Sequence, residues 1–195
     1  MLFEKLKKQI LSRLESEIKP CLYYHNLSHT LDVVDATLRL AKLEGVSRNY
    51  TTLLASAALL HDVGMLDNYK DHEAASVNIA QKLLPELNYK ASDIAEICDL
   101  IMATRLPQEA STLGEMIICD ADLDYLGRDD FFMIAHRLRS EWICLGKNYT
   151  LKDWYSMQAD FLTKHHYFTQ SAIQLREPTK QLHLQQILEL LKMTA

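Results

Sequence analysis

Hydrophobic residues recur every three or four positions along most of the chain, which is the period of an amphipathic α-helix. No stretch shows the strict alternation of apolar and polar residues that is typical of a half-buried strand. Glycines, prolines and capping residues mark where the helical stretches begin and end. The pattern predicts helices over about 2–18, 28–43, 51–64, 72–84, 92–104, 113–119, 129–146 and 151–167, and a last helix that begins at Thr179.

Capping residues support two of these boundaries. Ser28 is a residue type that favours the N-cap, and it precedes the second predicted helix. Thr150, followed three residues later by Asp153, forms the pattern of a capping box. The local signals therefore agree with the hydrophobic period at both places.

The composition narrows the fold class further. The 195 residues include only 5 Gly and 4 Pro, which disfavours folds with many tight turns, such as β-sandwiches and small barrels. No linker, repeat or low-complexity tract interrupts the chain. We therefore expect one all-α domain over residues 1–195, a bundle of about eight or nine helices in which the helices after residue 128 pack on the earlier ones.

Charge and the apolar runs exclude several classes of partner. A net charge of −5 argues against binding to duplex nucleic acid, because neutralising phosphates requires clustered Lys and Arg. The longest apolar run, Leu53–Leu60, is far shorter than the roughly 20 residues that cross a bilayer, and no signal-peptide pattern is visible. We expect a cytoplasmic protein without membrane contact.

The cysteines indicate no disulfide framework. They are widely scattered and form no Cys-x-x-Cys pair, so neither disulfides nor a zinc ribbon is expected. The sequence predicts four buried thiols, at Cys21, Cys98, Cys119 and Cys144.

His61 and Asp62 come directly after the longest apolar run. Burying an imidazole and a carboxylate is costly unless they are paired or bind a cation, and a metal ion would remove that cost. The alternative is that Asp62 faces solvent at a helix end before Gly64, with His61 as a hydrogen-bonded core histidine. The residues alone leave both interpretations open.

Two further histidines, His25 and His29, stand four residues apart. Zinc metalloproteases use this spacing, but they need a Glu after the first histidine, and Asn26 stands there. If Ser28 caps the helix, His25 lies just before it and His29 lies in its first turn, so that the two have different roles. The alternative is a polar helix start with two exposed imidazoles.

Three acidic residues, Asp120, Asp122 and Asp124, follow a second apolar run. An EF-hand calcium loop begins in the same way, but it needs Gly at its sixth position and Glu at its twelfth, where Tyr125 and Phe131 stand. A calcium loop is therefore excluded. We expect Asp120, the first after the apolar run, to point inward, and Asp122 and Asp124 to lie at the surface or to act as caps.

Taken together and in this order, the three motifs resemble the HD superfamily of metal-dependent phosphohydrolases. The resemblance covers about residues 23–128, and it is carried by the stretches Tyr24–His29, Leu59–Gly64 and Ile118–Gly127. It implies a divalent metal ion held by His29, His61, Asp62 and Asp120.

The implied metal is Mn, Fe, Mg, Co, Ni or Zn, because mixed imidazole and carboxylate ligands suit such ions. His72, in the first turn of the next predicted helix, is a candidate further ligand. Glu73 beside it is another, and either could assist the nucleophilic water. The alternative is that the acidic residues at this helix start, Asp71 and Glu73, simply complement the helix dipole. Thr104 stands where relatives with two metals tend to have another histidine, so we expect one metal.

The motif Tyr-His-Asn-x-x-His is also similar to that of cyclic-nucleotide phosphodiesterases in the superfamily. It implies that His25 protonates the leaving oxygen, with Asn26 orienting it, and Asp62 is expected to share in catalysis. A phosphate needs positive charge beyond the metal. The candidate substrate-binding residues are therefore Asn26, Lys70, Arg105 and Arg128.

The resemblance implies an enzyme that cleaves a small phosphoester, expected to be a nucleotide, with a metal-activated water. The alternative is a non-catalytic HD module that binds a nucleotide or a protein partner and keeps the metal as a structural ion. An oxygenase on the same scaffold is disfavoured by Thr104. A homodimer is compatible with the sequence.

Overall fold

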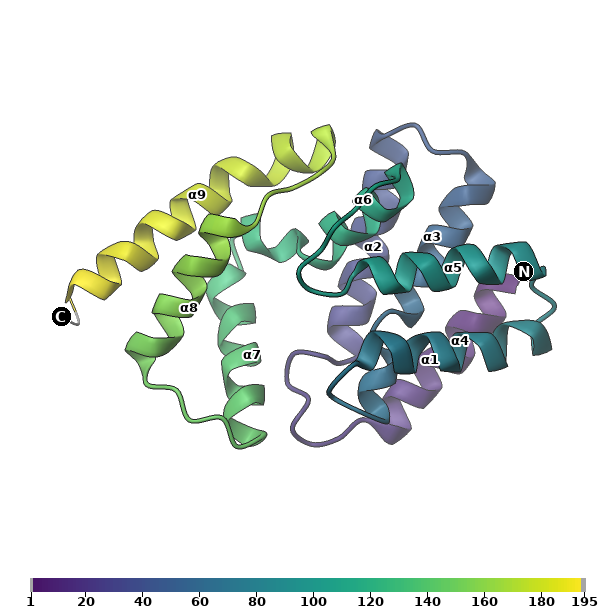
Figure 1. The fold of residues 1–195 in the computed structure, drawn as a ribbon, viewed down its shortest axis with the longest axis horizontal. Helices are drawn as coiled ribbons and strands as arrows, with labels where there is room; N and C mark the ends of the chain where they lie inside the picture. The colour runs from purple at the N-terminus through teal and green to yellow at the C-terminus, as the bar shows by residue number, and fades with distance from the viewer. Residues whose placement is uncertain (1, 194–195) are drawn as a thin grey trace.

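The computed structural model describes residues 2–193, and these residues confirm the predicted all-α class. They form nine α-helices and two short 3-10 helices, with no strand among them (Figure 1). Residues 1, 194 and 195, which belong to the predicted domain, lie outside the described residues. The elements are α1 (Leu2–Glu17), α2 (Leu27–Leu43), α3 (Arg48–Leu60), η1 (Val63–Leu66), α4 (His72–Glu86), α5 (Ala91–Ala103), α6 (Leu113–Asp122), η2 (Asp124–Gly127), α7 (Phe131–Cys144), α8 (Leu151–Lys164) and α9 (Gln170–Met193).

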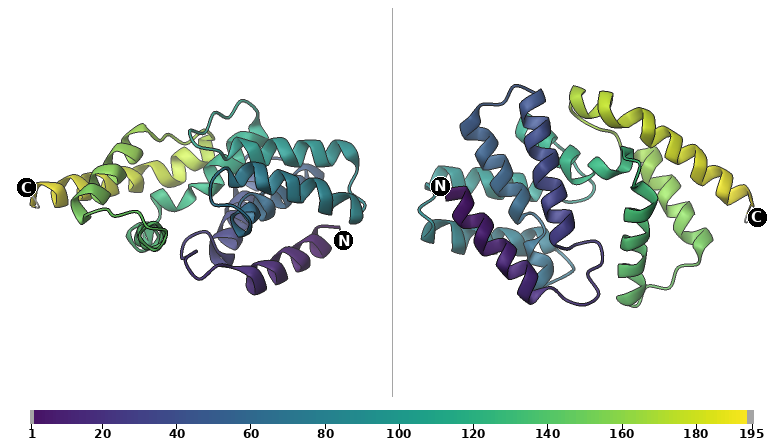
Figure 2. Two further views of the ribbon diagram at one scale, coloured as in Figure 1. Left: turned by 60° about the horizontal axis from the view of Figure 1, so that its bottom comes forward. Right: turned by 180° about the vertical axis from the view of Figure 1, so that it is seen from behind.

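The helices form two groups that lie side by side. Helices α1–α6 gather around α3 at the N-terminal end of the molecule, and α7–α9 form the C-terminal group (Figures 1 and 2). Hydrogen bonds near η2 join the groups: Tyr167 donates to the carbonyl of Leu123 at 3.2 Å, His183 Nδ1 contacts the carbonyl of Leu126 at 2.9 Å, and Arg176 Nε donates to Asp124 at 2.8 Å. We refer to these as the N-terminal group and the C-terminal group.

The apolar run seen in the sequence forms the centre of the N-terminal group. Every residue from Leu54 to Leu60 is buried, and α3 packs between α2, α5 and α1. Burial of such a run removes several hundred Å² of apolar surface from water, at about 25 cal/mol per Å². Because α3 ends inside the group, the residues that follow it, His61 and Asp62, are also buried.

Two glycines permit close approaches between elements. A Cβ on Gly64 would lie 2.1 Å from the carbonyl oxygen of His72, and a Cβ on Gly127 would lie 2.2 Å from that of Arg176. Gly64 therefore lets η1 pack against the start of α4, and Gly127 lets η2 pack against α9. Both glycines lie next to candidate site residues in the sequence.

The capping predictions have mixed outcomes. Thr150 and Asp153 form the predicted capping box at the start of α8. The prediction that Ser28 caps α2 is wrong, because Asn26 is the N-cap and accepts the backbone N–H of Ser28 at 2.8 Å and of His29 at 3.3 Å. The shift moves the helix start by one residue but keeps His29 in the first turn, as predicted.

The predicted start of the last helix is also wrong. Helix α9 begins at Gln170, not at Thr179, and it continues through Pro178. Thr169 supplies the start signal, because its hydroxyl accepts the N–H of Ala172 at 3.2 Å. Proline removes one backbone donor from a helix, and here tertiary packing on α8 and η2 outweighs that loss.

The cysteine prediction needs one correction. Cys98 and Cys119 are buried thiols as predicted, but Cys21 and Cys144 form a disulfide. The two cysteines are separated by 123 residues in the chain, so their proximity depends on how the two groups dock. The bond joins the segment between α1 and α2 to the last residue of α7.

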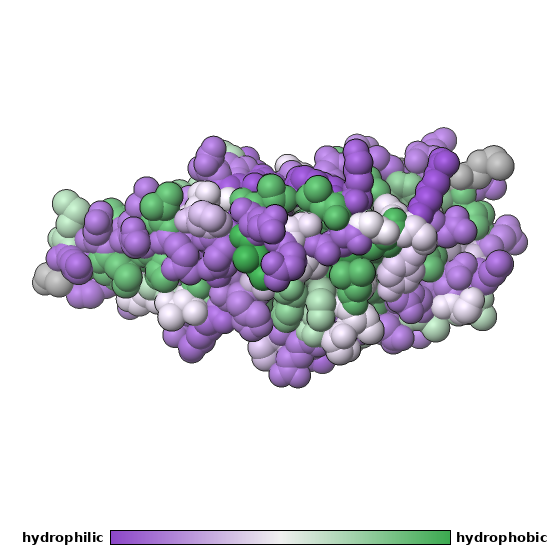
Figure 3. Space-filling model, turned by 90° about the horizontal axis from the view of Figure 1, so that it is seen from above, coloured by the Kyte–Doolittle hydropathy of each residue, from purple (hydrophilic) through white to green (hydrophobic). Residues whose placement is uncertain are grey.

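The surface is mainly polar where Figure 3 shows it, with hydrophobic side chains in small groups among hydrophilic ones. Among the described residues, no helix is both long enough and apolar enough to cross a bilayer.

Candidate metal centre

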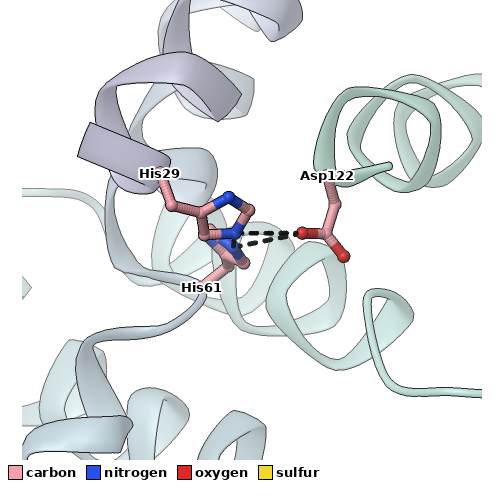
Figure 4. A group of neighbouring side chains, drawn as sticks. All are labelled: His29, His61 and Asp122. Atoms are coloured by element: carbon pink, nitrogen blue, oxygen red, sulfur yellow. Dashed lines mark hydrogen bonds and ion pairs between the residues drawn. The ribbon is translucent and has the colours of Figure 1, made fainter. Parts of the chain in front are cut away.

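Three separate elements deliver the side chains of the candidate centre. Asn26 fixes the start of α2, which puts His29 on the first turn and directs it inward. His61 and Asp62 follow the buried end of α3, and Asp122 is the last residue of α6. Figure 4 shows His29, His61 and Asp122 pointing toward one another from these elements.

The donor atoms of these side chains are close together. His29 Nε2 lies 3.3 Å from His61 Nε2, 3.3 Å from Asp62 Oδ2 and 3.4 Å from Asp122 Oδ1. His61 Nε2 lies 3.2 Å from the same Asp62 oxygen and 3.4 Å from the same Asp122 oxygen. We call His29, His61, Asp62 and Asp122 the metal cluster.

The spacing among His29, His61 and Asp122 fits a metal ion, and Asp62 lies beside the two histidines. Ligand atoms about 2.1 Å from a tetrahedral ion are separated from one another by roughly 3.4 Å. The tautomer also fits, because His61 Nδ1 lies 2.8 Å from the carbonyl oxygen of Ala58, which can only accept a hydrogen bond. With its proton held there, neutral His61 presents the Nε2 lone pair to the cluster, as a metal-ligating histidine does.

The electrostatics of the cluster indicate a shortage of positive charge. Burial lowers the pKa of His29 and of His61, but Asp62 and Asp122 outweigh it and raise both. Burial raises the pKa of Asp122, but the two histidines outweigh it and lower that pKa to about 2. Among residues 2–193, no lysine or arginine forms an ion pair with either carboxylate, so the centre favours a cation.

Asp120 points inward as predicted, but it is not part of the cluster, which contradicts its implied role as a metal ligand. Its Oδ1 accepts the N–H of Phe168 at 2.8 Å, and its Oδ2 accepts the N–H of Thr169 at 2.8 Å and the hydroxyl of Thr169 at 2.7 Å. Asp120 therefore anchors the start of α9. Asp122, two residues on, takes the place by the histidines.

Asp122 and Asp124 also depart from the expected surface or capping roles. Asp122 Oδ1 faces the histidines, while its Oδ2 accepts from Gln108 Nε2 at 3.2 Å. Asp124 is buried and pairs with Arg39 at 2.8 Å and with Arg176 at 2.8 Å. It connects α2, η2 and α9, and neither arginine reaches the metal cluster.

His72 lies against Oδ1 of Asp62, the oxygen that does not face His29 and His61. Its Nε2 is 3.2 Å from Asp62 Oδ1 and 3.5 Å from Glu73 Oε1. Asp62 thus faces His29 and His61 through Oδ2 and His72 through Oδ1. Thr104, in contrast, donates to the carbonyl of Ile101 at 2.8 Å, and it has no metal-ligating side chain.

His25 stands just before α2 and lies close to the cluster, with its ring centroid 6.0 Å from that of His29 and 5.9 Å from that of His72. Its Nδ1 donates to Oε1 of Glu141 in α7. Nothing in the sequence marks Glu141, because a single Glu in an amphipathic helix carries no local signal. Burial raises the pKa of Glu141, but the hydrogen bonds and charge of His25 lower that pKa by more.

The candidate substrate-binding residues are not gathered in one place. Arg128 is held by Asp130 at 2.9 Å and by Asp32 at 3.2 Å. Arg105 pairs with Asp71 at the start of α4, and Lys70 is exposed in the same segment.

Asn26 is occupied by the backbone it caps, and its Nδ2 donates to the carbonyl of Tyr23 at 2.7 Å. A small pocket beside the metal cluster is lined by Asn26, Arg128 and Arg137, together with His29 and Asp122. Arg137 was not among the sequence candidates, because nothing near it in the chain marks a site.

Comparison with known families identifies one match. The model of the HD domain family matches residues 26–124, about half of the chain. No curated protein matches the sequence.

Solved structures with the same fold span nearly the whole chain. The crystal structure of Bacillus subtilis YpgQ in complex with ADP has a TM-score of 0.69 and 19% identity, and the match covers 98% of this chain and 96% of that one. A predicted HD superfamily hydrolase from an uncultured Thermotogales bacterium has a TM-score of 0.63 and 20% identity, over 98% and 92% of the two chains. At such identities the similarity concerns the fold.

Proposed function

The chain belongs to the HD domain family, and from this premise we propose that it is a metal-dependent phosphohydrolase acting on a nucleotide. The observation that carries the proposal is the metal cluster, in which the Nε2 atoms of His29 and His61 lie 3.3 Å from each other and 3.2–3.4 Å from one oxygen each of Asp62 and Asp122. Buried carboxylates without a lysine or arginine partner are costly, and a divalent cation would neutralise them.

The residues that would hold the ion are His29, His61, Asp62 and Asp122, with His72 on the adjoining oxygen of Asp62. The mixed nitrogen and oxygen donors are compatible with Mn, Fe, Mg, Co, Ni or Zn. When bound, such an ion acidifies a water and polarises a phosphoryl oxygen. Gln108 keeps the second oxygen of Asp122 in place, which orients that carboxylate toward the histidines.

His25 is the proposed general acid. Imidazole is the side chain best suited to donate a proton near neutral pH, and His25 lies beside the metal cluster without belonging to it. As the bond between phosphorus and the leaving oxygen breaks, His25 donates its Nε2 proton to that oxygen. Asp62, with one oxygen toward His29 and the other toward His72, is placed to orient the attacking water.

A nucleotide is the proposed substrate class. YpgQ, which shares the fold, has been crystallised with ADP. Positive side chains border the site from two directions, with Arg128 and Arg137 on the pocket beside the metal cluster and Arg105 near His72. Arginine binds phosphate oxygens through paired N–H groups, so each is a candidate contact, with Lys70 and Asn26 as further ones.

The test is metal analysis of the purified protein, followed by hydrolysis assays with the identified metal restored. The panel contains a nucleoside triphosphate, ADP, a cyclic nucleotide and a simple phosphomonoester. We expect cleavage of at least one nucleotide by the wild type and none by His61→Ala. Binding of nucleotide and metal without cleavage of any member would reject the enzyme in favour of a non-catalytic HD module.

A further inference from the structure

The matched HD region ends at residue 124, yet the side chain that holds His25 lies beyond it, in α7. Glu141 is fully buried between the two helix groups. One of its oxygens, Oε2, accepts the backbone N–H of Tyr24 at 2.8 Å and that of His25 at 3.0 Å. The segment that carries His25 is therefore fixed to α7 by its backbone as well as by its ring.

The other oxygen of Glu141, Oε1, binds the ring of His25 and the side chain of Tyr69. Oε1 accepts His25 Nδ1 and also the hydroxyl of Tyr69 at 2.9 Å, and Tyr69 in turn accepts the indole N–H of Trp142 at 2.9 Å. A carboxylate can only accept hydrogen bonds, so Nδ1 must carry a proton. With Nδ1 occupied, only Nε2 is left to exchange a proton with another molecule.

We propose that Glu141 is a positioning residue that holds His25 as a proton donor, so that the centre favours phosphoesters whose leaving oxygen must be protonated. The inference rests on the proposed function, in which His25 is the acid. During the reaction the water oxygen bonds to phosphorus, the phosphorus–oxygen ester bond breaks, and the Nε2 proton moves to the leaving oxygen. Glu141 keeps its negative charge and the Nδ1 proton stays where it is, as in other carboxylate–histidine pairs.

The variant Glu141→Gln isolates this role because it keeps the shape of the side chain. Its carboxamide oxygen would continue to accept from the two backbone N–H groups, so its NH₂ group would face His25 Nδ1. A donor at that point favours the opposite tautomer of neutral His25 and disfavours the protonated ring. The imidazolium, which can give up its Nε2 proton while Nδ1 keeps its own, is therefore disfavoured, and the metal cluster is untouched.

Two control variants alter the same junction without removing the carboxylate. Tyr69→Phe deletes one donor to Glu141 and leaves His25 paired. The double variant Cys21→Ser/Cys144→Ser breaks the covalent link between the same two segments, four residues before His25 and three residues after Glu141. If α7 only holds the segments together, the disulfide variant should resemble Glu141→Gln.

The first experiment compares two phosphodiesters of one nucleotide under the restored metal. One has p-nitrophenol as its leaving group, which departs without a proton, and the other has a simple alcohol. For Glu141→Gln we expect kcat on the alkyl ester to fall about 10²–10⁴-fold, the usual contribution of an acid, with KM and metal content unchanged and kcat on the p-nitrophenyl ester falling less than about 10-fold. Tyr69→Phe and the disulfide variant should keep the wild-type ratio between the two esters.

The second measurement does not depend on activity. Nitrogen NMR of the His25 ring, assigned with His25→Gln and recorded on metal-free protein, should show a protonated Nδ1 in the wild type and the opposite tautomer in Glu141→Gln. Glu141→Asp, which keeps the charge, should restore the wild-type tautomer and part of kcat, and it replaces Glu141→Gln if that variant does not fold. If no ester is cleaved, the proposed function fails, and the NMR result still decides the role of Glu141. If Glu141→Gln lowers kcat equally on both esters, or if its His25 tautomer is unchanged, the positioning role of Glu141 is rejected.

Discussion

Two regions of the molecule bury histidines among charged groups, and they shift the histidine pKa in opposite directions. In the metal cluster the pKa values of His29 and His61 are raised because carboxylates outweigh burial. In the C-terminal group, burial and the nearby charge of Lys180 lower the pKa of His165 to about 4. We call the second set, His165, Tyr167, Glu177 and Lys180, the lysine cluster.

The difference lies in where the positive charge comes from. Lys180 is buried and donates to the carbonyl of His165 at 2.6 Å, and it pairs with Glu177 at 2.9 Å. The lysine cluster therefore contains its own cation, and a metal ion there would be repelled. The metal cluster has carboxylates without a lysine or arginine partner among the described residues, so its cation must come from solution. Buried histidines alone do not identify a metal site.

The largest effect should come from removing a carboxylate of the metal cluster. We expect Asp122→Asn to weaken metal binding by at least about 100-fold, because a site with few ligands cannot lose one. Asp120→Asn, two residues away, should retain the metal and instead lower the free energy of unfolding through the start of α9. Metal content after dialysis and thermal unfolding measure the two effects. Retention of the metal by Asp122→Asn would remove it from the ligand set.

Removing the proposed acid should affect turnover but not metal binding. His25→Ala is expected to lower kcat on an alkyl phosphoester by about 10²–10⁴-fold at full metal occupancy. His165→Gln, in the lysine cluster, should change kcat by less than about 3-fold, because no hydrogen bond or ring contact joins His165 to the metal cluster or to His25. Steady-state kinetics of both variants, alongside metal analysis, test the contrast. Unchanged turnover in His25→Ala would exclude it as the acid.

The affinity for metal should depend on pH mainly through His29 and His61. Because the pKa values of His29 and His61 are raised, metal binding must displace protons from them. Affinity should therefore increase with pH, by roughly tenfold per pH unit for each proton released. Calorimetry in buffers of different ionisation enthalpy counts those protons. The same slope is expected for His165→Gln, and binding without proton release would show that the histidines are already neutral.

The smallest effect concerns the stability of the metal-free protein. Unfolded histidine titrates near pH 6.5 and folded His165 near 4, so between these values the unfolded chain binds more protons. Stability should then fall as pH drops from about 6.5 to about 4, by on the order of 1–2 kcal/mol after allowing for partial solvation.

The metal cluster should behave in the opposite way in the same protein. Its histidines have raised pKa values, so their contribution is complete below about pH 6.5 and is lost as pH rises through the folded values. Urea unfolding from pH 4 to 8 separates the two windows. His165→Gln should flatten only the acidic one, and an unchanged acidic slope in that variant would assign it to other groups.

Much of the candidate centre was predictable from local sequence. His29 was expected in the first turn of a helix, and His61 and Asp62 follow an apolar run that is buried. The residues alone left their inward placement open, and the ordered set of motifs that resembles the HD superfamily pointed to it. The all-α class followed from the hydrophobic period and the scarcity of glycine and proline. That residues 1–195 form one domain stays a prediction.

Tertiary structure decided the features that depend on which side of a helix faces what. Asp120 and Asp122 lie two residues apart, about 200° around the axis of α6, so one faces the histidines and the other faces α9. Because the sequence does not show where α9 begins, it does not predict which of the two carboxylates binds the start of α9 and which faces the histidines. The partnership of His25 with Glu141 likewise depends on the docking of α7 more than 100 residues later.

The sequence by itself determined the all-α class and the approximate extent of most helices, because helix period and caps act over a few neighbouring residues. Only the folded chain decided which residues meet. Asp122 joins the metal cluster, Glu141 holds His25, and Cys21 reaches Cys144, because each contact closes a long loop that only the packing of whole helices brings together.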